Sequence, residues 1–149
     1  MKVVVDTNVI FSALLNSNST IGDVLFNSAQ HFEFYSCNYM RYEILKHWEK
    51  LKRISRLSEV QLLISYTQTI AKLKFINEEI IPVKIWLDAE QLTKEIDVDD
   101  TDFVALAKFL DAKLWTGDRM LYEGLLKLNF NNVLNTSQLL SIRSSNSNN

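Results

Sequence analysis

The stretch Val3-Val4-Val5-Asp6-Thr7-Asn8, close to the start of the chain, decides the fold. Its three valines are β-branched and apolar at consecutive positions, whereas a half-exposed strand alternates apolar and polar residues. The run therefore predicts a short strand that is buried on both faces, as in a parallel sheet covered by helices. Asp6 follows this strand directly, at the rim of the predicted core, where an unpaired carboxylate is costly.

Further short apolar runs alternate with amphipathic stretches along the chain. The runs predict strands at 33–37, 80–83, 113–116 and 132–135. The stretches predict helices at 8–15, 20–29, about 39–53, about 59–73, 85–95, 101–110 and 119–128, with a short helix after the last strand. Strands that alternate with helices favour right-handed crossovers and a parallel sheet. We therefore predict an α/β fold, a three-layer α/β/α sandwich around a central, mainly parallel sheet of about five strands.

Polar residues mark the starts of several predicted helices. Asn38 precedes the helix at 39–53 and is expected to cap it, and Asp118 is expected to cap the helix at 119–128. Ser58 and Gln61 have the spacing of a capping box for the helix at 59–73.

The composition is that of an ordinary globular protein. The chain of 149 residues predicts a single domain over 1–143, followed by a polar, disordered tail at 144–149. A net charge of −2 excludes a uniformly basic surface for nucleic acid, although it allows a local basic patch. Cys37 is the one cysteine, which excludes an internal disulfide. No run is long and apolar enough for a signal core or a membrane span, so we expect a cytoplasmic protein with no membrane partner.

Acidic residues gather where the predicted strands end. Asp118 follows the strand at 113–116, Glu43 lies about one turn into the helix after 33–37, and four acids precede or begin the helix at 101–110, namely Asp97, Asp99, Asp100 and Asp102. The carboxyl ends of parallel strands meet at one edge of a sheet, which is where ligands bind. Carboxylates gathered there repel one another unless a cation neutralises them, and oxygen ligands suit Mg²⁺ or Mn²⁺. His31 and His47 are isolated, which argues against zinc.

Each of these acids also has a purely structural interpretation. Asp118 and either Asp99 or Asp100 could simply be helix caps, and Glu43 could be a solvated helix residue. Thr7, Asn8 and Thr116 could orient the carboxylates or serve only as turn and helix-start residues. The argument for a site rests on the combination.

These motifs, in this order and spacing, resemble the PIN-domain family. The resemblance covers residues 2 to about 140 and rests on Val4-Val5-Asp6-Thr7-Asn8-Val9, on Glu43, on the stretch from Asp100 to Ala107, and on Leu114-Trp115-Thr116-Gly117-Asp118. It implies that the family's four catalytic acids correspond to Asp6, Glu43, Asp100 and Asp118. Asp97, Asp99 and Asp102 are near-equivalents of Asp100, and we expect them to contact the residues that bind the metal and not the metal itself.

The resemblance implies a metal-dependent ribonuclease, often the toxin of a type II toxin–antitoxin pair. Asp6 and Asp100 are then the main ligands of Mg²⁺ or Mn²⁺ and Asp118 a third, while Glu43 and Asp118 could also orient water. The family also implies a homodimer and an antitoxin partner. The early helices carry more apolar residues than are obviously needed to cover one small sheet: Ile10, Phe11, Leu14, Leu15, Leu25 and Phe26. This excess agrees with a dimer interface, although all six residues could belong to the core.

Six of the 16 basic residues lie between 41 and 56. Of these we expect Arg41, Lys46, Lys50 and Arg53 to contact the RNA backbone, an interaction that gives affinity without reading sequence. The simpler interpretation is a solvated helix face.

Two other functions fit parts of the pattern. A phosphatase with an aspartate nucleophile after the first strand usually has a second aspartate two residues on, where this chain has Asn8. A non-catalytic module that binds RNA or a protein is the other alternative, and the complete set of acids argues against it.

Overall fold

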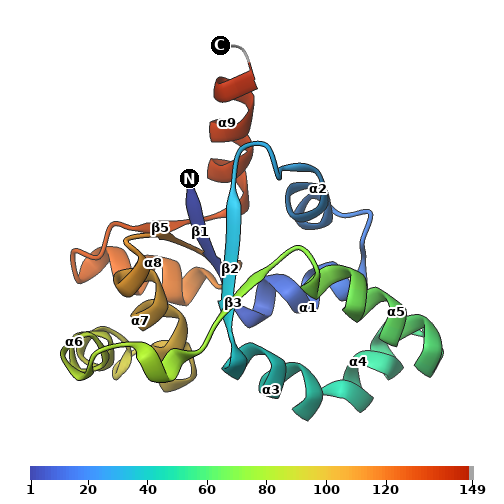
Figure 1. The fold of residues 1–149 in the computed structure, drawn as a ribbon, viewed down its shortest axis with the longest axis horizontal. Helices are drawn as coiled ribbons and strands as arrows, with labels where there is room; N and C mark the ends of the chain where they lie inside the picture. The colour runs from blue at the N-terminus through green and yellow to red at the C-terminus, as the bar shows by residue number, and fades with distance from the viewer. Residues whose placement is uncertain (148–149) are drawn as a thin grey trace.

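The computed structural model describes residues 1–147 and contains one five-stranded sheet (Figure 1). Its strands are β1 (Lys2–Val5), β2 (Glu33–Cys37), β3 (Lys74–Ile76), β4 (Lys113–Trp115) and β5 (Val133–Leu134). They are arranged in the order β3-β2-β1-β4-β5, and all the neighbouring pairs are parallel. The predicted parallel α/β architecture is therefore confirmed.

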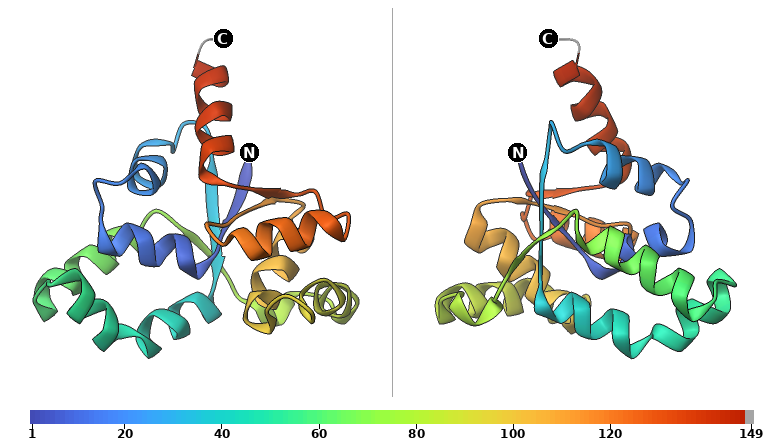
Figure 2. Two further views of the ribbon diagram at one scale, coloured as in Figure 1. Left: turned by 180° about the vertical axis from the view of Figure 1, so that it is seen from behind. Right: turned by 45° about the vertical axis from the view of Figure 1, so that its right-hand side comes forward.

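Helices cover both faces of this sheet, as Figures 1 and 2 show. One layer holds α1 (Thr7–Leu15), α2 (Thr20–Asn27), α3 (Asn38–Lys46), α4 (Trp48–Ser55) and α5 (Glu59–Ile70). The opposite layer holds α6 (Val83–Thr93), α7 (Thr101–Leu110) and α8 (Arg119–Lys127). The 3-10 turns η1 (Glu78–Ile80) and η2 (Val98–Asp100) precede α6 and α7, and α9 (Thr136–Ser147) follows β5.

The valines of β1 form the centre of the core. Val3, Val4 and Val5 are fully buried between β2 and β4, as their consecutive spacing predicted. The apolar residues of α7, such as Phe103 and Leu106, close the same core from the other layer. This packing fixes the ends of β1 and β4 side by side, and with them the residues that follow each strand.

The third strand was predicted in the wrong place. Residues 80–83 do not form a strand, because Ile80 ends η1 and Pro82 is the N-cap of α6. Proline lacks a backbone N–H and has a fixed φ, which suits the start of a helix better than a ladder. Ile81 explains the apolar signal, since its side chain is buried in the core. The actual strand β3 is an edge strand of three residues, with little pattern in the sequence.

The long helix predicted at 39–53 is broken in two. His47 ends α3 and precedes α4, with φ −104° and ψ 17°. Asn38 is the first helical residue and not the cap; the carboxylate of Glu78 accepts hydrogen bonds from the backbone N–H groups of Asn38 and Tyr39. A residue forty positions away therefore replaces the predicted local cap.

Two other predicted caps are confirmed. Ser58 and Gln61 form a reciprocal capping box at the start of α5. Asp118 caps α8 by accepting from the backbone N–H groups of Met120 and Leu121.

The last helix is longer than predicted. Residues 144–147, expected to be a disordered tail, continue α9, and 148–149 lie outside the described residues. Arg143 explains the order, because its guanidinium donates to Asp23 and to the hydroxyl of Ser28 and so ties α9 to α2 and the turn after it. Leu139 adds a fully buried contact.

Within residues 1–147, no helix is by itself both long and apolar enough to cross a membrane. The pair α1 and α2 would meet the length and composition only jointly, and the two helices are bent by 106° relative to each other.

Two glycines allow a matched test of the packing. A Cβ on Gly22 would lie 2.2 Å from the backbone oxygen of Ser17, whereas one on Gly124 would meet only the flexible tip of Ile96 at 2.6 Å. We expect Gly22→Ala to lower the free energy of unfolding by about 1–3 kcal/mol, since backbone must move. Gly124→Ala should change it by less than about 1 kcal/mol, because the gain in helix propensity offsets a side-chain shift. Urea denaturation of the two variants measures both, and equal losses would contradict this account of the close approach at Gly22.

Candidate functional site

Asp6 lies at the end of β1 and is almost fully buried, with 1% of its surface exposed. One carboxylate oxygen, Oδ1, caps α1 by accepting from the backbone N–H of Val9 at 3.0 Å. The other, Oδ2, has no hydrogen-bond partner among the described residues. Burial raises the pKa of Asp6 to about 6, with smaller contributions from the charges of Asp118 and Glu43, while the Thr116 hydroxyl and the Val9 N–H oppose the rise.

Asp100 is a second buried carboxylate at the same edge of the sheet. It ends η2 at the N-cap position of α7, yet its side chain makes no capping hydrogen bond. Its Oδ2, like that of Asp6, has no partner within residues 1–147. Burial raises the pKa of Asp100 to about 8, and the negative charges of the acids around it, chiefly Asp6, add to the rise.

Glu43 and Asp118 complete the group from opposite sides. Glu43, half-buried on α3, accepts a hydrogen bond from the Thr7 hydroxyl at 2.5 Å. Burial raises the pKa of Glu43, although the bond from Thr7 opposes this. Asp118 follows β4, and its backbone N–H donates to the hydroxyl of the buried Thr116 at 3.0 Å. The charges of Glu43 and Asp118 raise the pKa of both Asp6 and Asp100, so the four predicted acids lie near enough to one another to interact electrostatically.

The neighbouring acids have separate structural roles. Exposed Asp97 caps η2 by accepting from the backbone N–H of Asp99 at 2.9 Å. Exposed Asp99 accepts from the hydroxyl of Tyr39 at 3.0 Å, which links η2 to α3. Asp102 lies near Cys37 and Glu78 instead. Of the four acids between 97 and 102, Asp100 is therefore the one whose charge interacts most with Asp6.

Cys37, Glu78 and Asp102 form a compact group that the sequence analysis missed. Their candidate ligand atoms all lie within 4.8 Å of one another; no other group of acid, cysteine or histidine side chains in residues 1–147 is as compact, so the four predicted acids are more widely spaced. Burial, followed by the charges of Glu78 and Asp102, raises the pKa of the Cys37 thiol far above its usual range. Burial also raises the pKa of Asp102 to about 6. A thiol held protonated is a poor metal ligand, because metals bind the thiolate. No local sequence motif indicates this group, because its three residues come from β2, η1 and α7.

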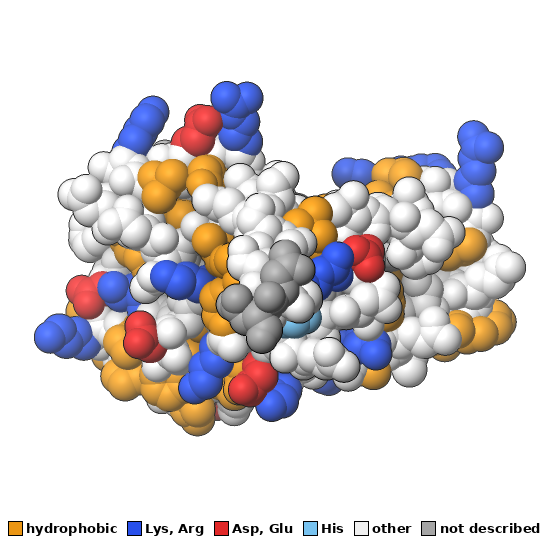
Figure 3. All heavy atoms as spheres, turned by 90° about the horizontal axis from the view of Figure 1, so that it is seen from above, with side chains coloured by type: hydrophobic (Ala, Val, Ile, Leu, Met, Phe, Trp, Pro, Cys, Tyr) orange, Lys and Arg blue, Asp and Glu red, His pale blue; other side chains and the backbone are white. Residues whose placement is uncertain are grey.

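The predicted RNA-contacting residues do not share one helix face, because the helix breaks at His47. Arg41 on α3 is engaged within the protein, with its guanidinium 3.8 Å from the centre of the Phe75 ring. Lys46, Lys50 and Arg53 are exposed. Lys50 is the one that lines a cavity of about 300 Å³ between α1 and α4, together with Asn8, Phe11 and His47. On the face seen in Figure 3, around the end of α9, basic and acidic side chains are interspersed.

The raised pKa values of the acid group predict that the protein becomes less stable as pH rises. An acid with a raised folded-state pKa binds more protons folded than unfolded, so the metal-free protein should lose stability as pH rises from roughly 4 to about 8. Asp100→Asn removes the group with the largest rise, and it should therefore increase the free energy of unfolding at pH 8 by on the order of a few kcal/mol.

Denaturation in EDTA at pH 5 and pH 8 measures the effect. Asp111→Asn is the matched control: Asp111 is the exposed C-cap of α7 with φ 51°, a left-handed conformation that asparagine adopts equally well. A wild type more stable at pH 8 than at pH 5, or a gain from Asp111→Asn as large as that from Asp100→Asn, would contradict the prediction.

Comparison with known proteins agrees with this geometry. No curated protein sequence matches the chain. Among solved structures, a chain of VapBC2 from Rickettsia felis, crystallised bound to a DNA fragment from their promoter, aligns with a TM-score of 0.67 at 14% identity over 91% of this chain and 98% of that one. PAE2754 from Pyrobaculum aerophilum aligns with a TM-score of 0.67 at 12% identity, over 97% and 90% respectively. At such identities these likenesses show the fold alone. The sequence pattern of the PIN domain matches residues 4–138, and the chain therefore belongs to the PIN domain family, whose members are generally nucleases.

Proposed function

We propose that the chain is a divalent-metal-dependent ribonuclease whose active site comprises Asp6, Glu43, Asp100 and Asp118. One observation carries the proposal. Two buried carboxylate oxygens, Oδ2 of Asp6 and Oδ2 of Asp100, have no hydrogen-bond partner in residues 1–147. A buried, unpartnered carboxylate oxygen is costly, and two of them in one acidic group favour the binding of a cation there.

The donor set fits Mg²⁺ or Mn²⁺. All four side chains offer hard carboxylate oxygens, which these ions prefer, and none of the four is a soft ligand. Asp6, Asp100 and Asp118 would hold the metal. When bound, the cation lowers the pKa of a water molecule and offsets charge on the phosphate oxygens.

The surrounding residues orient these acids. The Thr7 hydroxyl fixes one oxygen of Glu43, which leaves the other free to hold a water molecule or its proton. The hydroxyl of Thr116 positions the backbone at Asp118 and opposes the rise in the pKa of Asp6. Such supporting hydrogen bonds keep carboxylates aligned for a ligand.

The substrate proposed is single-stranded or structured RNA. Lys46, Lys50 and Arg53 are exposed on α3 and α4, the layer that carries Glu43, and would contact phosphates. The cavity between α1 and α4 is lined by Lys50 and by Asn8, which is close to Asp6 in the chain. The RNA strand would follow this cavity away from the acids.

We also propose that the chain is the cytoplasmic toxin of a toxin–antitoxin pair and forms a homodimer. The similarity to VapBC2, which was crystallised bound to a DNA fragment from its promoter, supports this proposal. Of the early-helix apolar residues, Ile10, Leu14 and Leu25 are core, which leaves the exposed Leu15 and the half-buried Phe11 and Phe26 for an interface. Sedimentation showing a clean monomer at high micromolar concentration would remove the dimer.

Asp6→Asn should abolish cleavage of single-stranded RNA while leaving the fold intact. Asparagine retains the size of aspartate and can still accept from the Val9 N–H, so the cap on α1 survives. It removes an anionic ligand, and we expect the rate with Mg²⁺ or Mn²⁺ to fall by at least ~100-fold. It also removes a buried charge, so metal-free stability should rise. Asp111→Asn again serves as the control and should cut RNA at the wild-type rate; wild-type cleavage by Asp6→Asn would refute the assignment.

Divalent ions should stabilise the wild type and not the Asp6→Asn variant. A ligand that binds only the folded state, at ten times its dissociation constant, adds about 1.4 kcal/mol, which raises the Tm of a chain of this size by a few degrees. Thermal melts at neutral pH with and without millimolar Mn²⁺ measure the shift. Equal shifts for the two proteins would place the ion elsewhere. No shift in either would favour the non-catalytic binding module over the nuclease.

A further inference from the structure

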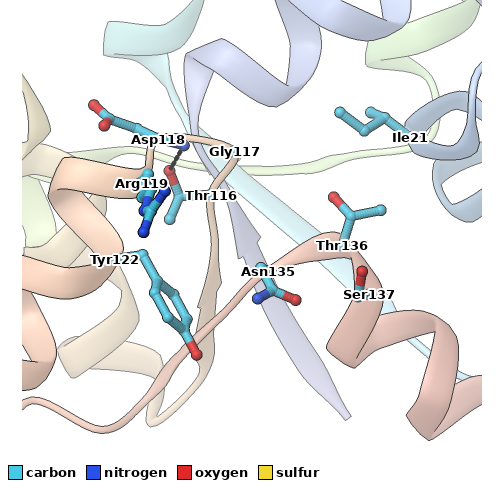
Figure 4. Close-up of a pocket in the computed structure, with 9 residues that line it drawn as sticks. All are labelled: Ile21, Thr116, Gly117, Asp118, Arg119, Tyr122, Asn135, Thr136 and Ser137. Atoms are coloured by element: carbon cyan, nitrogen blue, oxygen red, sulfur yellow. Dashed lines mark hydrogen bonds between the residues drawn. The ribbon is translucent and has the colours of Figure 1, made fainter.

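A second cavity, of about 410 Å³, lies beside Asp118 on the side away from α3 and α4. It opens between the turn after β4 and the start of α9, at the carboxyl ends of β4 and β5. Figure 4 shows Arg119 and Tyr122 on one side of it and Thr136 and Ser137 on the other. The cavity therefore adjoins the acid group at Asp118 and Thr116, which line it.

The lining is rich in groups that donate hydrogen bonds. Asn135 uses its side-chain oxygen to cap α9 by accepting from the Gln138 N–H, which leaves its amide nitrogen without a partner in residues 1–147. The hydroxyl of Tyr122 likewise has no hydrogen-bond partner among the described residues, whereas the hydroxyl of Thr136 accepts from the indole N–H of Trp115 at 3.0 Å. The carboxylate of Asp118 is directed away from Asn135 and Ser137, towards the first turn of α8 (Figure 4). Asp118 is the one acid among the described residues of the lining, and apart from it the cavity offers hydrogen-bond donors and an aromatic ring.

Arg119 adds a cation at the mouth of this cavity. Its Nε donates to Glu123 at 2.9 Å, one turn along α8, and its side chain is 87% exposed. Exposed pairs of this kind contribute little, so the guanidinium can turn to a phosphate at small cost. An arginine can bind a phosphate, while hydrogen-bond donors and an aromatic ring can bind a sugar and a base. The cavity therefore suits a nucleotide.

We propose that this cavity holds one ribonucleoside of the RNA substrate, next to the phosphate that is cleaved. The inference rests on the proposed ribonuclease function and extends it with a subsite. The volume falls within the range of roughly 300–1,000 Å³ that is usual for small-ligand sites. The Tyr122 ring provides a surface for the base, and the amide of Asn135 and the hydroxyl of Ser137 face the sugar and the base edge. RNA would then enter along Lys50 on one side of the acids and leave along Arg119 on the other.

The test uses the Asp6→Asn protein, so that the RNA stays intact during a binding measurement. Ser137→Glu places a negative charge in the cavity, while an acid in the first turn of α9 is favourable for the helix itself. We expect the Kd for a short, labelled single-stranded RNA, measured by fluorescence anisotropy, to rise about tenfold. Ser144→Glu is the matched control, with the same charge change on an exposed residue two turns further along α9, and its Kd should stay within about twofold of the parent's.

A second variant acts through shape instead of charge. A Cβ on Gly117 would have no atom within 4 Å, and no glycine in residues 1–147 has a positive φ, so Gly117→Val can fill this part of the cavity without strain. It should also raise the Kd about tenfold, with an unchanged Tm. If both cavity variants bind like the parent, or if Ser144→Glu weakens binding as much as Ser137→Glu, the subsite is refuted and the nuclease stands. If the wild type neither binds nor cuts RNA, both proposals fall.

Discussion

The burial of the Asp6 carboxylate at the end of a strand of fully buried valines is the constraint on which the rest of the site depends. The sheet places β1 between β2 and β4, so the residues that follow these strands must share one edge. Asp6, Glu43 and Asp118 come from those three strand ends, and α7 brings Asp100 to them from the other layer. Several like charges are thereby held together by a core that has no freedom to separate them.

A helix cap and a metal ligand are not exclusive roles for an aspartate, because a carboxylate has two oxygens. Asp6 uses Oδ1 to cap α1 and has no partner for Oδ2 within residues 1–147, and Asp118 likewise caps α8 through Oδ1. The cap holds the side chain in one orientation, and the free oxygen then has a fixed direction. Capping therefore does not exclude a second role for the other oxygen of such a residue.

Signals close together in the sequence predicted the fold and singled out the four acids as candidates, and long-range contacts account for what was missed. The valines of β1 and the acids after β1 and β4 could be identified because each strand and its acid are adjacent in the chain. The position of β3, the break at His47 and the cap on α3 could not. The carboxylate of Glu78 reaches the start of α3 from η1, and Ile81 is apolar because it packs in the core, not because it belongs to a strand. Neither contact leaves a local pattern. The sequence also offered Asp97, Asp99 and Asp102 as near-equivalents of Asp100, and the fold was needed to show that Asp100 is buried whereas Asp97 and Asp99 are exposed.

The strand order also has a consequence for how the protein is made. Neighbours β1 and β4 are separated in the chain by β2, β3 and the helices α1 to α7, so Asp6 emerges from the ribosome more than a hundred residues before Asp118. At typical rates of synthesis that interval is on the order of ten seconds. During it the chain holds Asp6 without the strand that completes its surroundings, and β5 and α9 are still to come. A nascent chain thus lacks the full acid group until synthesis is nearly complete, so the group forms only when β4 and the turn after it have been made.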